Sequence, residues 1–408
     1  MVKYYVPAVI RQVKNLEEEK RTVEKIAEDI VNIGVNDREI TLFEGQYEVK
    51  KGMAYNSYAI LDEQVVVMDT VDPRATTEWL KNLEEALGTR KVDYLVIQHM
   101  EPDHGGSIMQ LIERFPDMKL VGNAKTFQMF QQFFDVNPND KAITVKEGDT
   151  LSVGKHTLQF FMAPMVHWPE VMVTYEQSAK VLFSADGFGK FGTRDADEDW
   201  ACEARRYYIN ICGKYGMQVQ ALLKKAATLE INMICPLHGP ILTENLEYYI
   251  NKYQVWSGYE PEDEGVLIAC ASIHGHTMIA AEKMKELLEQ KGAKKVVIAD
   301  LTREDIHAIV ENAFRYSHLV LAAASYDASV FPPMEDFLNR LKAKNYQKRT
   351  VGIIENGSWA PTAARSMKAI LEGSKALTFA EPIVTIKSAL KEENIPQLEA
   401  LADELLNV

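Results

Sequence analysis

The sequence lacks paired cysteines, long apolar runs and any excess of positive charge. Its four cysteines form no Cys-x-x-Cys pair, which excludes a thioredoxin-type motif, a zinc ribbon and a rubredoxin-type iron site. Scattered cysteines of this kind are typical of reduced thiols in a cytoplasmic protein. No segment reaches the roughly 18 to 20 uninterrupted apolar residues that a membrane span requires. The N-terminal stretch has no apolar core followed by a small-residue cleavage site, so we expect neither a membrane anchor nor a signal peptide.

The charge balance narrows the class of partner. Asp and Glu number 59 against 45 Lys and Arg, which gives a formal net charge of −14. A chain with this balance does not neutralise a run of phosphates, so nucleic acid is excluded as the main partner and an anionic membrane surface is disfavoured. The 408 residues exceed what one ordinary core holds, so we expect a globular protein of two domains.

The first half of the chain mixes strand and helix patterns. Residues 16–33 have apolar side chains at helical spacing and Gly34 can end that helix, so we expect residues 1–34 to form a helical N-terminal extension. Short β-rich runs follow at residues 57–62, 64–69, 93–98, 158–163, 171–176 and 180–186. Because strands neighbour strands as well as helices in this order, we predict two sheets covered by helices over residues 35–255.

Beyond residue 265 the pattern becomes regular. Five β-rich runs alternate with five helical stretches, as in GVLIACAS followed by TMIAAEKMKELLEQKG. This alternation is typical of a doubly wound parallel sheet, which we predict for residues 265–408. The acidic segment 256–265, which contains Pro and Gly, is the expected boundary between the two domains.

The strongest chemical signal is a cluster of four potential metal ligands, His99, Glu101, Asp103 and His104, at the end of the β-rich run 93–98. A chance match to His-x-Glu-x-Asp-His in a chain of this length is on the order of one in a thousand. A polar loop with a capping acid explains one or two of these residues but not all four. The pattern therefore predicts a metal site.

Three further polar residues follow strands in the same half. His167, Asp186 and His238 each come just after a β-rich run, where loops from several strands can converge. Taken singly, each is more often structural, since a strand-end Asp commonly caps a turn. Together with the His99 cluster they complete a set of ligands. Three other histidines are interpreted as non-ligands: His156, His307 and His318.

These seven positions resemble the metallo-β-lactamase superfamily, whose hallmark is His-x-His-x-Asp-His followed by later His, Asp and His ligands. The departure is Glu101, which stands in place of the second histidine. Zinc hydrolases favour nitrogen and sulfur donors with an open water position, whereas a carboxylate-rich set suits harder, redox-active iron. His-x-Glu-x-Asp-His with His167, Asp186 and His238 is the pattern of flavodiiron proteins, which the chain resembles over residues 35–408.

The resemblance implies a metal assignment and a fold. One iron would be held by His99, Glu101 and His167, the other by Asp103, His104 and His238, and Asp186 would bridge them. Trp168, beside His167, would line the site, although a role as core filler is an equally good interpretation. The implied fold class is α/β, with a metallo-β-lactamase-like αββα sandwich followed by a flavodoxin-like doubly wound parallel sheet.

Loops at the carboxyl ends of the strands in the second half predict a ligand site. Residues 272–277 open a helix with hydroxyl groups at both ends and no lysine, which suits a phosphate at a helix N-terminus. An ordinary helix cap is the alternative for this loop on its own. Two further loops at the same edge each add an aromatic side chain with small residues beside it. The candidate residues are Ser272, His274, Gly275, His276, Thr277, Ser325, Tyr326, Asp327, Asn356, Gly357, Ser358, Trp359 and Ala360.

The three loops resemble those of short-chain flavodoxins, which implies FMN as the bound flavin. Two positions depart from the family pattern: His276 stands where Asn is usual, and Asp327 where Asn is frequent. The second departure places a negative charge near the flavin ring. We expect this charge to disfavour the anionic reduced flavin and to lower its reduction potential.

The resemblance implies an oxidoreductase with FMN and two non-haem irons per chain that reduces dioxygen to water, nitric oxide to nitrous oxide, or both. The implied partners are an external electron donor (rubredoxin, a flavin reductase or reduced deazaflavin) and a second copy of the chain in a head-to-tail homodimer, or a dimer of such dimers. Two alternatives stay open: a dizinc hydrolase with an attached flavodoxin domain, and a non-catalytic FMN electron carrier. The seven ligands do not distinguish dioxygen from nitric oxide.

Overall fold

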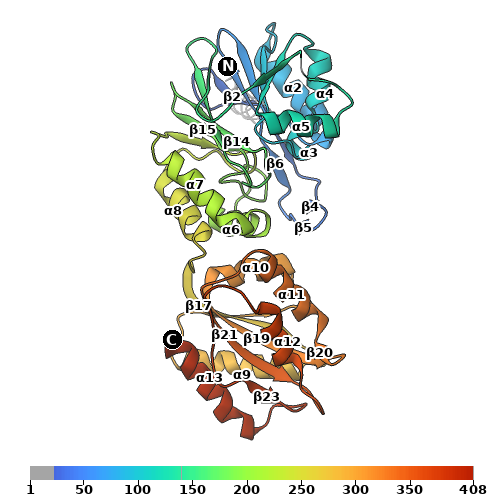
Figure 1. Ribbon diagram of the computed structural model, residues 1–408, viewed down its shortest axis with the longest axis vertical. Coiled ribbons are helices and arrows are strands. Elements are labelled where there is room, and N and C mark those ends of the chain that lie inside the picture. The colour runs from blue at the N-terminus through green and yellow to red at the C-terminus, as the bar shows by residue number, and fades with distance from the viewer. Residues whose placement is uncertain (1–22, 139, 408) are drawn as a thin grey trace, which may run out of the picture. The chain divides into compact units, whose positions relative to one another are not determined.

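The computed structural model (Figure 1) describes residues 23–138 and 140–407. The chain divides into two compact units. The first unit comprises Met1–Gly45, Val49–Asp197 and Leu229–Leu246, and the second comprises Gln46–Glu48, Glu198–Thr228 and Glu247–Val408. In the described ranges no helix has the length and apolar character that a bilayer span requires.

The first unit is built on two sheets. A seven-stranded sheet has the order β1-β2-β7-β8-β9-β10-β11, and a five-stranded sheet runs from β12 to β16 in chain order. The strands of the first sheet are β1 (Glu24–Lys25), β2 (Ile30–Asn32), β7 (Tyr58–Leu61), β8 (Val65–Met68), β9 (Tyr94–Val96), β10 (Lys119–Gly122) and β11 (Ala142–Thr144). Those of the second are β12 (Thr150–Ser152), β13 (Thr157–Met162), β14 (Met172–Glu176), β15 (Val181–Phe183) and β16 (Met233–Cys235). The six β-rich runs predicted for this half are all confirmed as strands.

The two sheets share one apolar core. Tyr58, Ile60 and Met68 from the first sheet belong to the same buried cluster as Phe160 and Phe183 from the second. The ring centroids of Tyr58 and Phe183 are 5.3 Å apart. Burying a large apolar side chain contributes roughly 1.5 to 3 kcal/mol relative to leaving it in water. This core fixes the strand ends from which the loops of the candidate metal site extend.

Helices of the first unit occupy the connections between strands. They are η1 (Pro73–Ala75), α2 (Thr76–Leu87), α3 (Pro102–Gly105), α4 (Ile108–Arg114) and α5 (Ala124–Phe133), and the short strands of this unit are β3 (Val35–Asp37), β4 (Leu42–Phe43) and β6 (Met53–Tyr55). Helix α2 buries Trp79 and Leu83. Helix α5 begins where the Asn123 side chain accepts hydrogen bonds from two backbone N–H groups of the first turn.

The predicted N-terminal helix is wrong where it can be compared with the structure. Residues 24–25 and 30–32 are the strands β1 and β2, and Ile30 pairs with Ile60 of β7. The apolar residues have helical spacing, but the segment forms a strand because Ile30 and Val31 are β-branched and bury their side chains in the sheet. Residues 1–22, which hold the rest of the predicted extension, lie outside the described residues.

The second unit contains the predicted doubly wound sheet. Its parallel strands have the order β18-β17-β19-β21-β22, and β23 also pairs with β21. The strands are β17 (Asp263–Ala271), β18 (Val296–Asp300), β19 (Tyr316–Tyr326), β20 (Ser329–Val330), β21 (Arg349–Asn356), β22 (Leu377–Phe379) and β23 (Val384–Ile386). The helices are α9 (His276–Gln290), α10 (Ile306–Arg315), α11 (Pro332–Ala343), α12 (Ala363–Leu371), η3 (Glu392–Asn394) and α13 (Ile395–Asn407). The predicted alternation is confirmed, and the short antiparallel strand β20 and the strand β22 are additions to it.

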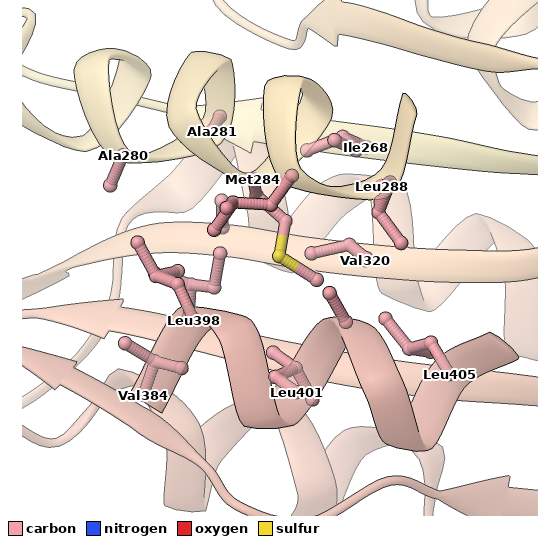
Figure 2. Packing of buried hydrophobic residues seen from close by; sticks show 14 of the residues in the cluster. Ile268, Ala280, Ala281, Met284, Leu288, Val320, Val384, Leu398, Leu401 and Leu405 are labelled. Atoms are coloured by element: carbon pink, nitrogen blue, oxygen red, sulfur yellow. The ribbon is translucent and has the colours of Figure 1, made fainter. Parts of the chain in front are cut away.

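Helices cover both faces of this sheet. On one face α9 and α13 pack together, and Met284, Leu398 and Leu401 lie in the same buried cluster as Ile268 and Val320 of the central strands (Figure 2). Helices α10, α11 and α12 contact strands of the same sheet and lie on its other face (Figure 1). The carboxyl ends of the strands remain open for loops that can hold a ligand.

Further segments group with the second unit: β5 (Tyr47–Glu48), α6 (Trp200–Ile211), η2 (Gly213–Tyr215), α7 (Gly216–Ala226) and α8 (Leu246–Ser257). Arg205 of α6 ties them to the flanking helices of the sheet. Its guanidinium lies 2.9 Å from Glu262 and is also paired with Glu311 of α10, and the Arg205 side chain is almost fully buried. Removing one partner of such a buried ion pair costs about 3 to 5 kcal/mol, so these pairs hold α6 in place.

Candidate metal centre and flavin cavity

The segment that contains the His-x-Glu-x-Asp-His motif turns sharply after β9. Glu101 is the N-cap residue of the short helix α3, which Pro102 opens and which carries Asp103 and His104, whereas His99 precedes the helix. Proline is well suited to the first turn of a helix because its missing N–H is not needed there. The change of backbone conformation between Glu101 and Asp103 directs the four side chains into two separate groups.

The other three candidates arrive from the second sheet. His167 lies in the connection between β13 and β14, Asp186 follows β15 and His238 follows β16. Loops after strands of both sheets therefore converge at one end of the shared core. The structure brings together all seven residues that the sequence singled out, in a group of His99, Glu101, His167 and Asp186 and a group of Asp103, His104 and His238.

Asp186 lies between the two groups. Its Oδ2 is 3.0 Å from His167 Nε2 and 3.3 Å from His99 Nε2 in the first group. Its Oδ1 is 3.3 Å from His104 Nε2 and 3.6 Å from His238 Nε2 in the second. One carboxylate thus presents one oxygen atom to each group, which is the arrangement of a ligand that bridges two metal ions.

The nitrogen and oxygen atoms within each group face one another at short distances. His104 Nε2 and His238 Nε2 are 3.0 Å apart, and both lie 3.2 Å from Asp103 Oδ2. Among the described residues, both Asp103 oxygens and Asp186 Oδ1 are buried without a hydrogen-bond partner. Buried carboxylates of this kind require a partner, and a cation at the centre of each group supplies one. The donor set therefore fits metal ions.

Outer hydrogen bonds orient two of the imidazoles. His99 Nδ1 lies 2.8 Å from Glu170 Oε1, which also accepts a hydrogen bond from the Met100 N–H. His238 Nδ1 lies 2.8 Å from the Ala54 carbonyl oxygen. Each contact turns Nε2 of the ring toward the groups, which is how metal-binding histidines are usually fixed. The sequence did not reveal these partners, since a backbone carbonyl has no residue signature and no spacing rule singles out Glu170.

The electrostatic interactions in the two groups favour protonated histidines and ionised carboxylates. Burial lowers the pKa of His99, His104 and His167, but neighbouring carboxylates outweigh it. Asp103 raises the pKa of His104 to about 10 and Asp186 raises that of His167 to about 9, and Asp186 holds the pKa of His99 well above its usual range. Burial raises the pKa of Asp103, yet His104 and His238 bring it well below normal. In the absence of a cation, the site therefore holds protons that metal binding must displace.

Several neighbours of the groups complete the site. The Trp168 ring packs edge-on against His99, with centroids 5.3 Å apart, so it lines the first group. The Phe43 ring makes a similar contact with His238 at 5.4 Å. Glu44, the next residue, has a left-handed backbone with φ 49°, and desolvation followed by the charge of Glu101 raises its pKa to about 7. No sequence pattern singles out Phe43 or Glu44, because they come from the short strand β4 and the turn after it, far from the ligands in the chain.

The remaining histidines lie elsewhere. His156 Nδ1 is 2.9 Å from Glu176, His307 Nδ1 is 3.0 Å from Asp305, and His318 lies beside Ser317 on β19. Within the described part of the chain, none of the three belongs to either metal-binding group. These positions agree with their interpretation as non-ligands.

A cavity of about 570 Å³ lies at the carboxyl ends of the strands in the second unit. Its volume is within the range of about 300 to 1,000 Å³ that is typical of cofactor sites. It is lined by twelve of the thirteen residues predicted from the sequence; Gly275 is the exception. The sequence did not single out the other lining residues, Ile273, Ala324, Ala328, Thr362 and Ser388.

One end of this cavity is the turn before α9. The Ser272 hydroxyl accepts a hydrogen bond from the Gly275 N–H at 3.0 Å, and Gly275 has the left-handed φ of 87° that glycine adopts without strain. Helix α9 then begins at His276. The backbone N–H groups of its first turn are the usual donors for a phosphate.

Hydrogen bonds between loops shape the rest of the cavity. Ser325 Oγ accepts from the N–H groups of Thr362 (2.8 Å) and Ala363 (3.2 Å) and so caps α12. The Asn356 side chain donates to the Ser388 carbonyl at 2.9 Å and accepts from the Ser388 N–H at 3.1 Å. Between these two anchors Trp359 is 92% exposed, which leaves its ring available to a planar ligand. Ser325 and Asn356 thus position the loops.

Asp327 lies at a strained turn on the rim of the cavity. It and Ala328 have φ of 45° and 56° and connect β19 to β20, whose pairing joins Ser325 to Val330 and Tyr326 to Ser329. A two-residue turn with both φ values positive is the hairpin type that favours Asn-Gly or Asp-Gly. Asp327 suits this turn, whereas Ala328 carries a steric cost in the left-handed region.

Both halves of the chain are similar to known proteins. The model of the ODP family beta lactamase matches residues 53–239, which include all seven metal-ligand candidates. The chain is 27% identical over 339 residues to the anaerobic nitric oxide reductase flavorubredoxin of Vibrio vulnificus, a match that covers 80% of this chain and 68% of that protein.

Solved structures match nearly the whole chain. The rubredoxin oxygen:oxidoreductase of Desulfovibrio gigas superposes with a TM-score of 0.87 at 25% identity, covering 94% of this chain and 98% of that one. The flavodiiron protein of Giardia intestinalis superposes with a TM-score of 0.83 at 25% identity, covering 94% and 95%. The fold is therefore a metallo-β-lactamase-like domain joined to a flavodoxin-like domain, as predicted. Over nearly its whole length the chain is therefore similar to flavodiiron proteins.

Proposed function

We propose that the chain reduces dioxygen to water, nitric oxide to nitrous oxide, or both, with electrons that an external donor delivers through FMN. The observation that carries this proposal is Asp186, whose two oxygen atoms face two separate groups of nitrogen and carboxylate donors. Glu101 in the first group favours iron over zinc because it supplies a hard oxygen donor where a zinc hydrolase has an imidazole. A cytoplasmic location fits the scattered cysteines and is part of the same proposal.

The residues that would hold two irons follow from the two groups. We assign His99, Glu101 and His167 to one iron, Asp103, His104 and His238 to the other, and Asp186 to both. Four neutral imidazoles and three carboxylates offset three of the four positive charges of a diferrous pair. The small residual charge suits a buried site.

When bound, the two irons would supply electrons and a pair of adjacent Lewis-acid positions, and FMN would pass electrons on one at a time. The residues of the chain have a separate role, which is to hold the metal ligands in position. Glu170 and the Ala54 carbonyl fix the imidazoles of His99 and His238. The Trp168 ring packs edge-on against the His99 imidazole and so supports its position in the first group.

The cavity of the second unit would hold FMN. The N–H groups at the start of α9 and the hydroxyl of Ser272 suit its phosphate, and Tyr326 and Trp359 suit the two faces of its ring. We propose that residues 35–255 carry the metal site and residues 265–408 the flavin site. Since these sites belong to different domains, we also propose a head-to-tail homodimer that pairs the flavin of one chain with the irons of the other. Full activity of a monomer at nanomolar concentration would contradict the dimer.

Turnover at a matched donor tests the function. Reduced rubredoxin or a chemically reduced deazaflavin is supplied to the chain, and oxygen uptake is set against anaerobic consumption of nitric oxide. We expect at least one gas to be consumed by the unmodified chain and by a control variant at the exposed Asp117, and consumption to be lost in Asp186→Asn. A chain that binds iron and FMN but consumes neither gas would be an electron carrier.

A dizinc hydrolase is the second candidate, and the metal content distinguishes it. Iron is measured with ferrozine and zinc in the same sample, after expression in medium that contains both metals. Stoichiometric zinc together with hydrolysis of an ester or lactam probe would support the hydrolase. The presence of Glu101 in the first group is the observation against it.

A further inference from the structure

The charges that line the flavin cavity are unusual for a phosphate site. Of the described lining residues, the ionisable ones are His274, His276, Tyr326 and Asp327, and neither lysine nor arginine is among them. The phosphate of a flavin mononucleotide carries about −1.5 to −2 charges at neutral pH. Within the described lining, positive charge for it can come only from the start of helix α9 and from protonated imidazole.

The two histidines are placed where such a phosphate would lie. His276 is the first residue of α9 and His274 lies in the turn that the Ser272 hydroxyl closes. Both side chains line the cavity and are exposed, so each can rotate onto a ligand. The backbone donors and dipole of α9 act equally at every pH. An imidazole contributes a full charge only when it is protonated, and its ordinary pKa of about 6.5 lies within the physiological range.

The cationic groups on the neighbouring elements lie outside the lining of the cavity. The loop after β18 lies beside the turn, since the Leu301 N–H donates to the Cys270 carbonyl. Its charged residues interact with one another: Arg303 Nε lies 3.5 Å from Asp300 Oδ2, and Glu304 accepts from the Asp300 N–H. On the other side of the cavity the charged neighbours are Asp327, on the rim, and Lys387, next to the lining residue Ser388.

We propose that His274 and His276 bind the FMN phosphate as imidazolium ions and that they determine the preference of the site for FMN over riboflavin. The inference rests on the proposed FMN site and adds the chemistry by which this chain recognises the phosphate. A dianion beside an imidazole favours its protonated form, so binding of FMN and binding of protons are linked. The affinity for FMN therefore falls as the pH rises from 6 to 8, and the affinity for riboflavin, which lacks the phosphate, stays constant.

The experiment measures both flavins against the full-length chain after removal of bound flavin. Quenching of flavin fluorescence gives the Kd at pH 6, 7 and 8 at constant ionic strength. For FMN we expect the Kd to rise on the order of tenfold from pH 6 to pH 8, since one linked proton changes it by up to tenfold per pH unit. For riboflavin we expect a change of less than about twofold, because no charge is gained or lost by its ribityl chain.

Variants assign the effect to the two histidines. In the double variant His274→Asn/His276→Asn the FMN Kd is expected to show no rise from pH 6 to pH 8 and to stay near or above the pH 8 value of the unmodified chain. His318→Asn is the matched control, because His318 lies on β19 outside the cavity lining, and it should keep the full slope. Circular dichroism verifies the fold of each variant. If the double variant fails to fold, NMR titration of the histidines in the unmodified chain replaces it, and their signals should shift with FMN but not with riboflavin.

Each outcome bears on one claim. A pH slope that persists in the folded double variant, or an equal slope for riboflavin, would overturn the role of the histidines. FMN binding without any pH dependence would overturn the same inference and leave the proposed flavin site intact. If neither flavin binds at any pH, both the inference and the proposed FMN site are wrong.

Discussion

The metal centre and the flavin cavity are built in opposite ways. Side chains at the ends of strands from two sheets form the metal centre, and His99, Asp186 and His238 are 0%, 5% and 1% exposed. Loops at one edge of a single sheet form the cavity, and Trp359 on its rim is 92% exposed. A buried group of charges depends on every member, whereas an open loop site tolerates exchange of single side chains. Single substitutions should therefore change binding and turnover more in the metal centre than in the cavity.

The largest effect is expected for Asp186→Asn. The amide cannot present a negatively charged oxygen to each of the two groups, and the buried histidines lose their common partner. Since even outer partners of metal ligands change metal affinity or activity by about 10- to 100-fold, loss of this shared ligand should reduce turnover by on the order of 100-fold or more. Iron content by ferrozine and gas consumption with a chemical donor measure the effect.

FMN content is the control for that variant. It should stay at the level of the unmodified chain, because the cavity lies in the other unit. An Asp186→Asn chain with full iron and full turnover would show that this carboxylate is not shared between two metals.

A smaller effect is expected for Glu170→Gln. The amide keeps the shape of the side chain but weakens the contact to His99 Nδ1, so the imidazole is held less firmly. A loss of about 10- to 100-fold in metal affinity or turnover is expected. The exposed Glu113→Gln on α4 is a suitable control. Identical metal retention in both variants during dialysis against a chelator would remove the proposed role of Glu170.

Metal uptake should depend on pH in a direction set by the histidines. In the metal-free chain the carboxylates, Asp103 and Asp186, raise the pKa of His104 to about 10 and that of His167 to about 9. Both rings therefore hold protons at pH 7, and metal binding must release them. The apparent affinity should rise with pH from 7 toward 9, by up to about tenfold per pH unit for each proton released. Calorimetry of Fe²⁺ binding in buffers of different ionisation enthalpy counts the protons, and a count of zero would contradict the assignment.

The smallest effect is expected in the cavity, for Asp327→Asn. Removing the negative charge should favour the anionic reduced flavin and raise its reduction potential. Because the side chain is on an open rim, a shift of roughly 10 to 30 mV is expected, which corresponds to at most about 1.4 kcal/mol for two electrons. Asparagine also suits the left-handed φ of 45°, so the fold should be unaffected. A redox titration that shows no shift would remove the electrostatic role of Asp327.

The contrast between the sites also explains what the sequence could predict. Four metal-ligand candidates lie within six residues, and the other three follow strands, so side-chain chemistry alone identified the set. The partners of the histidines could not be found in this way. Glu170 meets His99 through a contact between residues 71 positions apart, and the partner of His238 is the carbonyl of Ala54.

The cavity and the strand β2 show a second limit of what can be predicted from the sequence. Ser388 reaches the cavity because the Asn356 side chain holds it from 32 residues away, a contact that no local pattern indicates. The apolar residues at 26, 30 and 33 have helical spacing, yet β2 forms because its pairing with β7 buries Ile30. Regular alternation in the second half predicted its fold correctly, since the central strands β17, β19 and β21 are long and apolar and helices separate them.

Metal content combined with flavin reoxidation tests the central claim most directly. The chain is purified without oxygen, its iron and zinc are measured, and its FMN is reduced and then exposed to dioxygen or nitric oxide in separate stopped-flow experiments. We predict two irons per chain, little zinc, and reoxidation of the flavin by at least one gas at a rate that Asp186→Asn abolishes. A chain with two zinc ions, or one whose flavin is reoxidised at the same rate after Asp186→Asn, would contradict the account.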